Sequence, residues 1–251
     1  MSTIGKGIQV LELLGRNPKG LALRDISKSL GFPKSSVHHI LKTFLAFDFA
    51  YQNQETRKYF LGLKCLQLSA RMLEQFDLRG IAKNHLIELN EKSGEIVQLY
   101  TLRSGRLICI DKIGTQKPGL SISSFVGWTT EPHAAASGKV LLSELSEEEI
   151  MNIYPQKILR VYGKNTITDF EELLRELQLV REQGYAIDDE EYYEGVRCVA
   201  APIRAGKKIV AAVSITGSIF QITMKRINQK LIFLVTAAAE KISNELSNVQ
   251  I

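Results

Sequence analysis

The sequence contains little cysteine, and its cysteines form no pattern. Three stand far apart in the 251 residues, Cys65, Cys109 and Cys198, and no CxxC pair occurs. An odd number of isolated cysteines argues against a disulfide framework and against a structural zinc site, and it favours a reducing compartment. We therefore expect a cytoplasmic protein with no metal site and no cofactor.

Long apolar runs are also lacking. The longest uncharged stretch, residues 209–224, includes Ser, Thr, Gly and Gln and is too short to cross a bilayer. The first residues lack the charged-then-apolar pattern of a signal peptide. Hydrophobic residues make up 45% of the chain and charged residues 24%, which is ordinary for a globular protein. These features predict one large or two modest ordered domains and no membrane association.

The segment PHAAASGKVLL, residues 132–142, lacks the parts of a phosphate-binding loop. Such a loop needs Gly five positions before its Gly-Lys pair and Ser or Thr directly after the Lys. The corresponding residues here are His133 and Val140, so the hydroxyl that would hold magnesium is missing. Two interpretations of the segment remain at this point, a catalytic site and a sensing pocket.

Positive charge is concentrated at one end of the chain. The first 75 residues carry eleven Lys and Arg against five Asp and Glu, a net charge of +6, whereas the remainder has a net charge of −1. A small basic module beside a near-neutral larger one is typical of a polyanion-binding domain joined to a second domain. A chance excess of solvated charge is the alternative.

Apolar spacing predicts three short helices in the first 46 residues. The residues that mark their apolar faces are Ile4, Ile8, Leu11 and Leu14, then Leu23, Ile26 and Leu30, then Val37, Ile40, Leu41 and Phe44. Gly31 ends the second helix and Pro33 opens the third, with the tight GFPK turn between them. Two short helices joined in this way predict a helix-turn-helix motif.

Polar residues on and after the third helix are the candidates for contact with double-stranded DNA. They are Lys34, Ser35, Ser36, His38, His39, Lys42 and Thr43 of the helix, with Arg57 and Lys58 of the following segment. Small hydroxyl residues allow close approach to base edges and phosphates, and Lys42 supplies charge. The stretch FAYQNQETRKYFLG predicts a hairpin wing that would place Arg57 and Lys58 against phosphates or the minor groove. A protein-binding three-helix module is the alternative.

A broad apolar face follows the wing. In LGLKCLQLSARMLEQF, one row at helical spacing contains Leu63, Leu66, Ala70 and Leu73, and a second contains Cys65, Leu68 and Met72. A connecting helix with so wide a face packs against its own domain or against a partner subunit. A partner would supply the two-fold symmetry that palindromic DNA requires.

The remaining residues predict an α+β domain around an antiparallel sheet. We expect a helix over 78–92, a hairpin of EIVQLYTL and LICIDKI, helices near 134–153 and 167–183, and a second hairpin of CVAAPIR and IVAAVSITG. A long helix closes the chain, with one side formed by Ile227, Leu231, Leu234, Ala238 and Ile242.

Two groups of residues in this part could carry chemistry. Four carboxylates, residues 188–191, precede a strand, and an enzyme could use one or two of them as an acid–base pair or as a metal site with His133. A solvated acidic turn is the alternative. Cys198 could be an activated thiol, although cysteines in strands are more often inert. Ser214 and Thr216 share one face of a strand, where hydroxyls suit a small polar ligand or pair with each other in the core.

Five stretches resemble the isocitrate lyase regulator (IclR) family of bacterial transcription factors. They are FPKSSVHHILKTF, YFLGLKCLQLS, PHAAASGKVLL, GYAIDDEEYYEGVRCVAAPI and VSITG, in this order. The resemblance implies a winged helix-turn-helix DNA-binding domain over 1–61, a linker helix over 62–77 and a GAF-like effector-binding domain over 78–251. It also implies a homodimer or a dimer of dimers on a palindromic operator, regulated by a small-molecule effector that is often an organic acid.

The same resemblance assigns an effector pocket. Backbone N–H groups of Ala136 and Ser137 would hold a carboxylate at a helix start. The other residues that the resemblance implies for the pocket are Asp188, Cys198, Ser214 and Thr216, and it gives His133 and Lys139 structural roles.

Two residues depart from the family pattern. His39 stands where an Arg is common, which weakens a phosphate or guanine contact and makes it sensitive to pH. Ala22 stands where a Ser or Thr usually caps the second helix, which costs about 1 kcal/mol locally.

We expect a ligand-responsive transcriptional regulator, a repressor rather than an activator, without catalytic activity. The alternative is a small-molecule enzyme that uses Cys198 or the carboxylates of residues 188–191.

Overall fold

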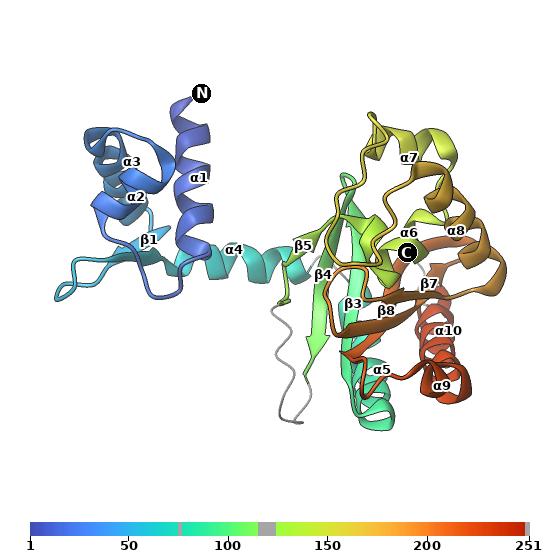
Figure 1. Cartoon of the computed structure of the whole chain (residues 1–251). Coiled ribbons are helices and arrows are strands. Elements are labelled where there is room, and N and C mark those ends of the chain that lie inside the picture. Colours follow the sequence, from blue (N-terminus) through green and yellow to red (C-terminus); the bar gives the residue numbers. More distant parts are fainter. Residues whose placement is uncertain (75–76, 115–123, 249–251) are drawn as a thin grey trace. The chain divides into compact units, whose positions relative to one another are not determined.

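The computed structural model describes residues 1–74, 77–114 and 124–248 (Figure 1). The chain divides into two compact units, Met1–Phe76 and Asp77–Ile251. Residues 75 and 76 of the predicted linker lie outside the described residues, as does the side chain of Leu73. The helix that follows the wing groups with the first unit. The limits of a DNA-binding domain, a linker and an effector domain stay a prediction.

The first unit has the predicted three helices, a hairpin and a further helix. Their bounds are α1 Thr3–Gly15, α2 Leu23–Leu30, α3 Lys34–Ala46, β1 Ala50–Gln52, β2 Tyr59–Leu61 and α4 Leu63–Glu74. Strands β1 and β2 pair antiparallel, and an isolated bridge joins Leu21 to Tyr59. This bridge ties the hairpin to the segment before α2, so the wing is anchored to the helical part of the unit.

A small apolar core holds the three helices together. Its buried members are Val10, Leu14, Ile26, Val37, Ile40, Leu41, Ala50 and Tyr59. The third helix buries the predicted side, and α2 ends at Gly31 in the left-handed conformation, as the sequence predicted. Ala22 occupies the N-cap of α2 and makes no side-chain capping bond there, so this helix start lacks the stabilisation that a Ser or Thr gives.

The face predicted for α1 is wrong in its first half. The side chains of Ile4 and Ile8 are 78% and 52% exposed. The helix instead buries Gly7, Val10 and Leu14. Gly7 lies so close to Phe44 that an added Cβ would stand 3.2 Å from its ring. The small residue therefore turns toward the core, and the two isoleucines remain on the outside.

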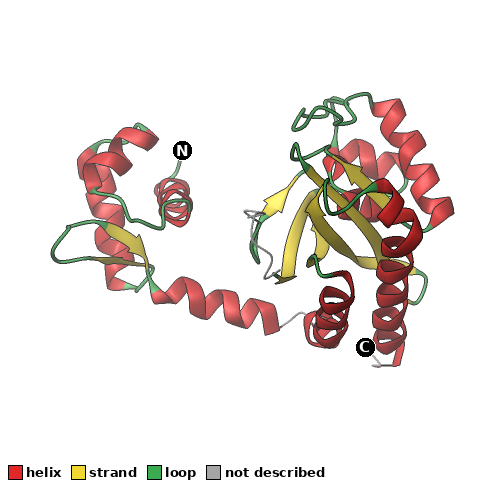
Figure 2. Ribbon diagram, turned by 60° about the horizontal axis from the view of Figure 1, so that its bottom comes forward, coloured by secondary structure: helices red, strands yellow, loops and turns green. Residues whose placement is uncertain are grey.

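The second unit is built on a six-stranded antiparallel sheet (Figure 2). Its strands are β3 Ile96–Arg103, β4 Arg106–Ile113, β5 Thr129–Thr130, β6 Ala186–Asp189, β7 Val196–Ala205 and β8 Lys208–Ser218, in the spatial order β5-β4-β3-β8-β7-β6. Both predicted hairpins, β3–β4 and β7–β8, are confirmed. The α+β class is confirmed as well.

Helices cover the sheet. Those of the second unit are α5 Asp77–Ser93, the 3₁₀ turn η1 Pro132–Ala134, α6 Ala136–Leu142, α7 Glu147–Ile153, α8 Phe170–Gln183, α9 Met224–Arg226, the π-turn η2 Ile227–Leu231 and α10 Ile232–Asn248. Helix α10 packs on β7 and against α5, whereas α6 contacts β3, β6, β7 and β8 and is backed by α8. The inner pocket described below lies where α6 meets the sheet.

The closing helix differs from its predicted pattern. A π-turn at Ile227–Leu231 inserts an extra residue into the helical repeat. Val235, rather than the predicted Leu234, is therefore fully buried, together with Ile227, Leu231 and Ile242. None of the helices in the described residues is long and apolar enough to cross a membrane.

We predict that Gly62→Ala destabilises the first unit. A Cβ at residue 62 would lie 2.0 Å from the carbonyl oxygen of Asp48, a backbone atom that cannot move aside alone. The clash should lower the free energy of unfolding by about 1–3 kcal/mol, as overpacking usually does. Denaturant unfolding followed by circular dichroism measures this effect.

Gly80→Ala is the matched control. Residue 80 lies in α5, where nothing stands within 4 Å of an added Cβ. The control should leave stability unchanged or raise it by up to about 1 kcal/mol. Equal stability of the two variants would contradict the prediction.

Candidate functional site

The outer surface of α3 is polar and accessible. Lys34, Ser35, His38, His39, Lys42 and Thr43 are exposed and Ser36 is half-buried. Val37, Ile40 and Leu41 face the core. The hydroxyl of Thr43 donates to the carbonyl of His39, at 3.2 Å. The helix thus offers hydroxyl, imidazole and ammonium groups to solvent on a rigid support.

The hairpin turn is shaped by one asparagine. The Asn53 Oδ1 accepts hydrogen bonds from the backbone N–H groups of Glu55 and Thr56, at 3.1 and 2.8 Å. Arg57 follows with a φ of 56°, and its side chain is exposed, whereas that of Lys58 is half-buried. The turn therefore presents Arg57 more openly than Lys58.

The inner pocket of the second unit lies beneath α6. Its lining residues are Gln98, Tyr100, Ser124, Trp128, Ala135, Ala136, Ser137, Asp188, Tyr192, Tyr193, Val196, Cys198, Ser214 and Thr216. They surround a cavity of about 50 Å³. The structure thus brings together all six residues that the family resemblance implied for the pocket.

Strand register explains why these residues meet. Asp188 on β6 pairs with Cys198 on β7, and Cys198 pairs with Thr216 on β8. Ser214, two residues earlier on β8, pairs with Gln98 on β3. Because side chains alternate along a strand, Ser214 and Thr216 point to the same face of the sheet. Four strands thus deliver one polar surface toward α6.

A hydrogen-bonded chain forms the floor of the pocket. The Thr216 hydroxyl donates to the Gln98 Oε1, at 3.2 Å. The Gln98 Nε2 donates to the Tyr100 hydroxyl and to the Ser124 hydroxyl, both at 2.8 Å. All four residues are buried, and these bonds hold their side chains in place. A ligand that binds there therefore loses little affinity to the ordering of these side chains.

Asp188 contributes a buried carboxyl group to the pocket. Its Oδ1 accepts the backbone N–H of Glu191, at 2.8 Å. Burial raises the pKa of Asp188 to about 6. Burial also raises the pKa of the Cys198 thiol well above its usual range, and the carboxyl of Asp188 adds to the effect. Both groups therefore favour their neutral forms more strongly than the same groups in water.

A buried ammonium lies behind the pocket. Lys139 is 1% exposed, and its Nζ lies 2.6 Å from the Glu191 Oε1 and 2.9 Å from the Glu176 Oε1. Burial alone would lower the Lys139 pKa, but the two carboxylates together raise it. Lys139 thus links α6, α8 and the loop after β6 through one charged group.

Glu191 is the least favourably placed carboxyl group of this ion-pair cluster. Burial raises its pKa to about 7, against the attraction of Lys139 and with a contribution from Asp188. Within the described part of the chain, its Oε2 is buried without a hydrogen-bond partner. The pKa values of Asp188 and Glu191 are raised to about 6 and about 7, so this pair of carboxyl groups favours holding a proton near neutral pH.

His133 is fully buried, and both of its ring nitrogens are engaged. The Nε2 lies 2.9 Å from the carbonyl oxygen of Arg160, to which it donates. The Nδ1 lies 3.2 Å from the Tyr154 hydroxyl, and the His133 backbone N–H donates to the same hydroxyl. Burial lowers the His133 pKa. The ring nitrogens of His133 are thus engaged by Tyr154 and Arg160 and not by the carboxyl groups with which the enzyme alternative would combine it.

Eight of the fourteen residues that line the pocket are not among those expected from the sequence. Gln98 and Tyr100 follow the alternation of β3 and could have been found as polar residues on the face of a strand. Trp128, Tyr192 and Tyr193 come from connecting segments. No periodic pattern marks such segments, and only the folded chain shows that they reach the pocket.

Comparisons with known proteins agree with this architecture. Residues 3–54 match the family described as "IclR helix-turn-helix domain", and residues 70–244 match "Bacterial transcriptional regulator IclR C-terminal". The regulator XynR of Escherichia coli is 33% identical over 217 residues, which is 86% of each chain. The repressor AllR of E. coli is 31% identical over 222 residues, covering 88% of this chain and 82% of AllR.

A solved structure shares the fold over its whole length. It is an IclR homologue from Microbacterium hydrocarbonoxydans, crystallised with 4-hydroxybenzoate. The TM-score is 0.84 at 22% identity, and the match covers 98% of this chain and all of that one.

We predict that Glu191→Gln flattens the pH dependence of stability. The folded-state pKa of about 7 lies above the usual 4.5 of a glutamic acid. The folded state therefore binds more protons between these values, and the free energy of unfolding falls as the pH rises through about 7. A glutamine still accepts from Lys139 but does not titrate. It should remove at least about 1 kcal/mol of that fall.

Denaturant unfolding between pH 5 and pH 8 measures the profile. The fluorescence of Trp128, the only tryptophan in the chain, reports on the pocket itself. Glu240→Gln, on the exposed side of α10, is the control and should keep the original slope. A Glu191→Gln profile as steep as that of the unsubstituted protein would count against the assignment.

Proposed function

The chain belongs to the IclR family of bacterial transcriptional regulators, and we propose that it is a repressor whose binding to a palindromic operator is changed by a small organic acid in the inner pocket. The observation that carries this proposal is that α3 of one unit has an accessible face of hydroxyl and ammonium groups, while the other unit has a pocket with buried hydroxyl residues in its wall.

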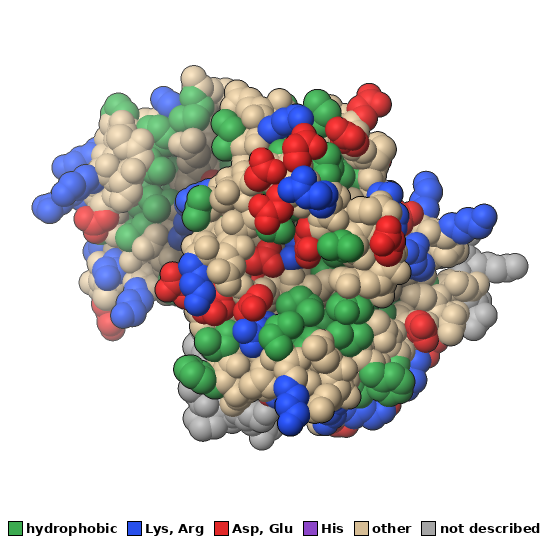
Figure 3. Space-filling view, turned by 45° about the vertical axis from the view of Figure 1, so that its right-hand side comes forward, with side chains coloured by type: hydrophobic (Ala, Val, Ile, Leu, Met, Phe, Trp, Pro, Cys, Tyr) green, Lys and Arg blue, Asp and Glu red, His purple; other side chains and the backbone are tan. Residues whose placement is uncertain are grey.

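The outer face of α3 supports direct contact with DNA. Ser35 and Lys42 are both exposed on it. Hydroxyl and ammonium groups at the surface of a recognition helix bind phosphates and base edges in the major groove. Arg57 on the hairpin turn would add a backbone or minor-groove contact. The face of the second unit in Figure 3 shows acidic and basic side chains intermixed, consistent with its near-neutral charge.

The inner pocket supports a small oxygen-rich effector. Ser137, Ser214 and Thr216 are buried hydroxyl residues in its wall. The raised pKa of Asp188 reduces the repulsion that an acid would meet there. The fold neighbour from M. hydrocarbonoxydans holds 4-hydroxybenzoate, which is an organic acid. AllR is named a repressor, and we extend both features to this chain as part of the proposal.

Exposed apolar residues of the first unit support a dimer, and a dimer supports the proposal that the operator is palindromic. Ile4 and Ile8 of α1, together with Leu63, Leu66 and Met72 of α4, are exposed apolar residues. A homodimer, or a dimer of dimers, would cover such faces and match the two-fold symmetry of the DNA. Since its target is DNA, we place the protein in the cytoplasm.

A sensor explains the pocket better than an enzyme does. The raised pKa of the Cys198 thiol opposes a nucleophilic thiolate. Glu191 is engaged by Lys139, and Asp188 is engaged by the backbone of the same loop. We therefore propose that the pocket binds its ligand and releases it unchanged, whereas an enzyme would convert it.

The test of the proposal is fluorescence anisotropy with DNA from upstream of the gene, compared with scrambled DNA across a salt series. Tight, salt-sensitive binding with a strong preference for the upstream sequence is the expected result. Absence of binding to any duplex at low salt would overturn the proposal and bring the enzyme alternative forward.

We predict that Lys42→Ala weakens operator binding and lowers the salt slope of log K by about one, because one phosphate contact is lost. Lys230→Ala, an exposed lysine of the second unit, is the matched control and should leave both quantities unchanged. A Lys42→Ala slope equal to that of the unsubstituted protein would mean that Lys42 does not touch the backbone.

We predict that an organic acid that binds the protein loses about tenfold or more in affinity in the Ser214→Ala/Thr216→Ala double variant, since two hydrogen bonds are removed. Calorimetry against a panel of organic acids that includes 4-hydroxybenzoate measures this effect. Ser247→Ala, on the exposed side of α10, is the control. An acid that binds the double variant as tightly as the original protein does not use this pocket.

A further inference from the structure

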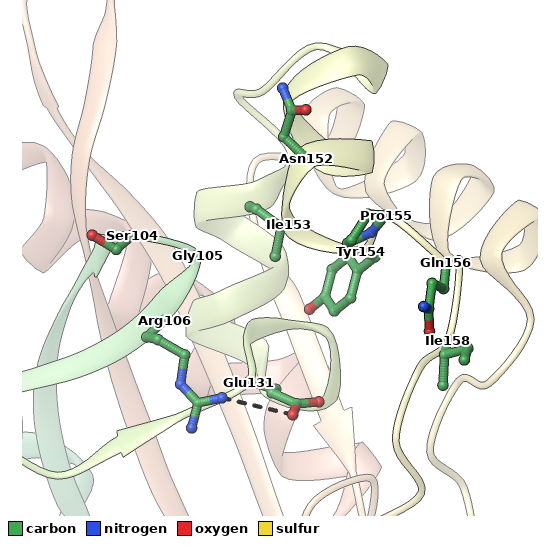
Figure 4. A pocket seen from close by; sticks show the side chains of 10 residues that line it. All are labelled: Ser104, Gly105, Arg106, Glu131, Asn152, Ile153, Tyr154, Pro155, Gln156 and Ile158. Atoms are coloured by element: carbon green, nitrogen blue, oxygen red, sulfur yellow. Dashed lines mark ion pairs between the residues drawn. The ribbon is translucent and has the colours of Figure 1, made fainter. Parts of the chain in front are cut away.

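A second cavity is lined in part by Glu131, which lies in the chain between Trp128 and Ala135 of the inner pocket. Its volume is about 510 Å³, and its lining residues are Ser104, Gly105, Arg106, Glu131, Asn152, Ile153, Tyr154, Pro155, Gln156 and Ile158 (Figure 4). Small-molecule sites commonly measure about 300–1,000 Å³. None of these residues belongs to the inner pocket.

The cavity presents two opposite charges side by side. The Arg106 Nη1 lies 3.7 Å from the Glu131 Oε1, with side-chain exposures of 51% and 24%. This separation is too long for a hydrogen bond, so the ion pair leaves each group's hydrogen-bonding capacity for another molecule. Figure 4 shows the two side chains pointing toward one another along one wall of the cavity.

The rest of the wall is apolar with an amide rim. Ile153 and Pro155 also line the cavity, and Ile158 is 68% exposed although it is a large aliphatic residue. Asn152 and Gln156 contribute side-chain amides. An occupant that suits this surface has an aliphatic part next to two compact charges.

We propose that this cavity is a binding site for a free α-amino acid with an apolar side chain. The carboxylate of the amino acid binds the Arg106 guanidinium, and its ammonium binds the Glu131 carboxylate. In an α-amino acid these two groups are attached to the same carbon, which suits a guanidinium and a carboxylate that stand in neighbouring positions. The aliphatic side chain packs on Ile153, Pro155 and Ile158.

The chain between the two cavities is short and firmly held. Glu131 immediately precedes the 3₁₀ turn Pro132–Ala134, and α6 begins at Ala136, a residue of the inner pocket. Tyr154 lines the second cavity and bonds through its hydroxyl to His133 within that turn. Trp128 of the inner pocket stands three residues before Glu131. An amino acid whose ammonium binds Glu131 would therefore shift the segment between Trp128 and Ala136, which lines the inner pocket.

The amino acid would be a second ligand of the protein. Its binding can be tested by itself, whereas an effect of that binding on regulation rests on the proposed function. Calorimetry of the full chain with L-leucine tests the binding itself. Two analogues each lack one charge, namely 4-methylpentanoate without the ammonium and 3-methylbutylamine without the carboxylate. We expect L-leucine to bind and each analogue to bind about tenfold or more weakly, since each loses a charge-assisted hydrogen bond.

Variants locate the site. Arg106→Gln and Glu131→Gln should each weaken L-leucine binding by about tenfold or more. Arg175→Gln, an exposed arginine of α8 that does not line the cavity, and the Ser214→Ala/Thr216→Ala double variant should bind as the original protein does. L-Leucine should also change Trp128 fluorescence in the original protein but not in Arg106→Gln. If Glu131→Gln disturbs the fold, as judged by circular dichroism, Arg106→Gln decides the question.

Three outcomes would overturn the proposal. One is the absence of binding at about 10 mM L-leucine, far above the range of a physiological effector. Another is binding that survives in Arg106→Gln. The third is loss of binding in the Ser214→Ala/Thr216→Ala variant, which would place the amino acid in the inner pocket. The anisotropy measurement with operator DNA does not depend on any of these three outcomes. The proposed function and the amino-acid site are therefore tested independently.

Discussion

The inner pocket depends on the buried ammonium of Lys139. This group joins three segments that are distant in sequence, since it pairs with Glu191 of the loop after β6 and with Glu176 of α8 while Lys139 itself belongs to α6. The loop carries Tyr192 and Tyr193, and α6 carries Ala136 and Ser137, so the ion pairs connect two segments that line the pocket. An unpaired buried charge is far more costly than a buried ion pair. We therefore expect α6, α8 and the loop after β6 to assemble cooperatively around Lys139.

The part of the pocket formed by the sheet is positioned by strand register and not by an ion pair. The row formed by Asp188, Cys198 and Thr216 crosses three strands at matched positions. A slip of one residue in any strand would send its member to the opposite face, beneath α5 and α10. The apolar members of the same strands, such as Val199 and Ile215, are fully buried on that opposite face. The burial of these hydrophobic residues thus fixes the positions of the polar ones.

Much of the fold could be predicted because it follows periodic patterns. The α3 face, the wing hairpin and both large hairpins of the second unit repeat with the period of a helix or a strand. The face of α1 was predicted wrongly because large apolar side chains were counted, while the close packing actually uses Gly7. Strand β6 was missed because it has four residues and ends in two carboxylates, which reads as an acidic turn. The pairing of Arg106 with Glu131 could not be predicted, since 25 residues separate them and neither belongs to a motif.

Under the proposed function, the two units would bind charged partners by different means. The first carries the entire positive excess of the chain, which attracts DNA from a distance and depends on salt. Among the described residues that line the inner pocket there is no Lys or Arg. An acid bound there must be held by hydroxyl and N–H donors, and the carboxyl of Asp188 must be neutralised or must accept a proton from the ligand. Hydrogen bonds of this kind select for the size and oxygen positions of a ligand more than for its charge, which is what the proposed sensor would need to distinguish one metabolite from the many other acids in a cell.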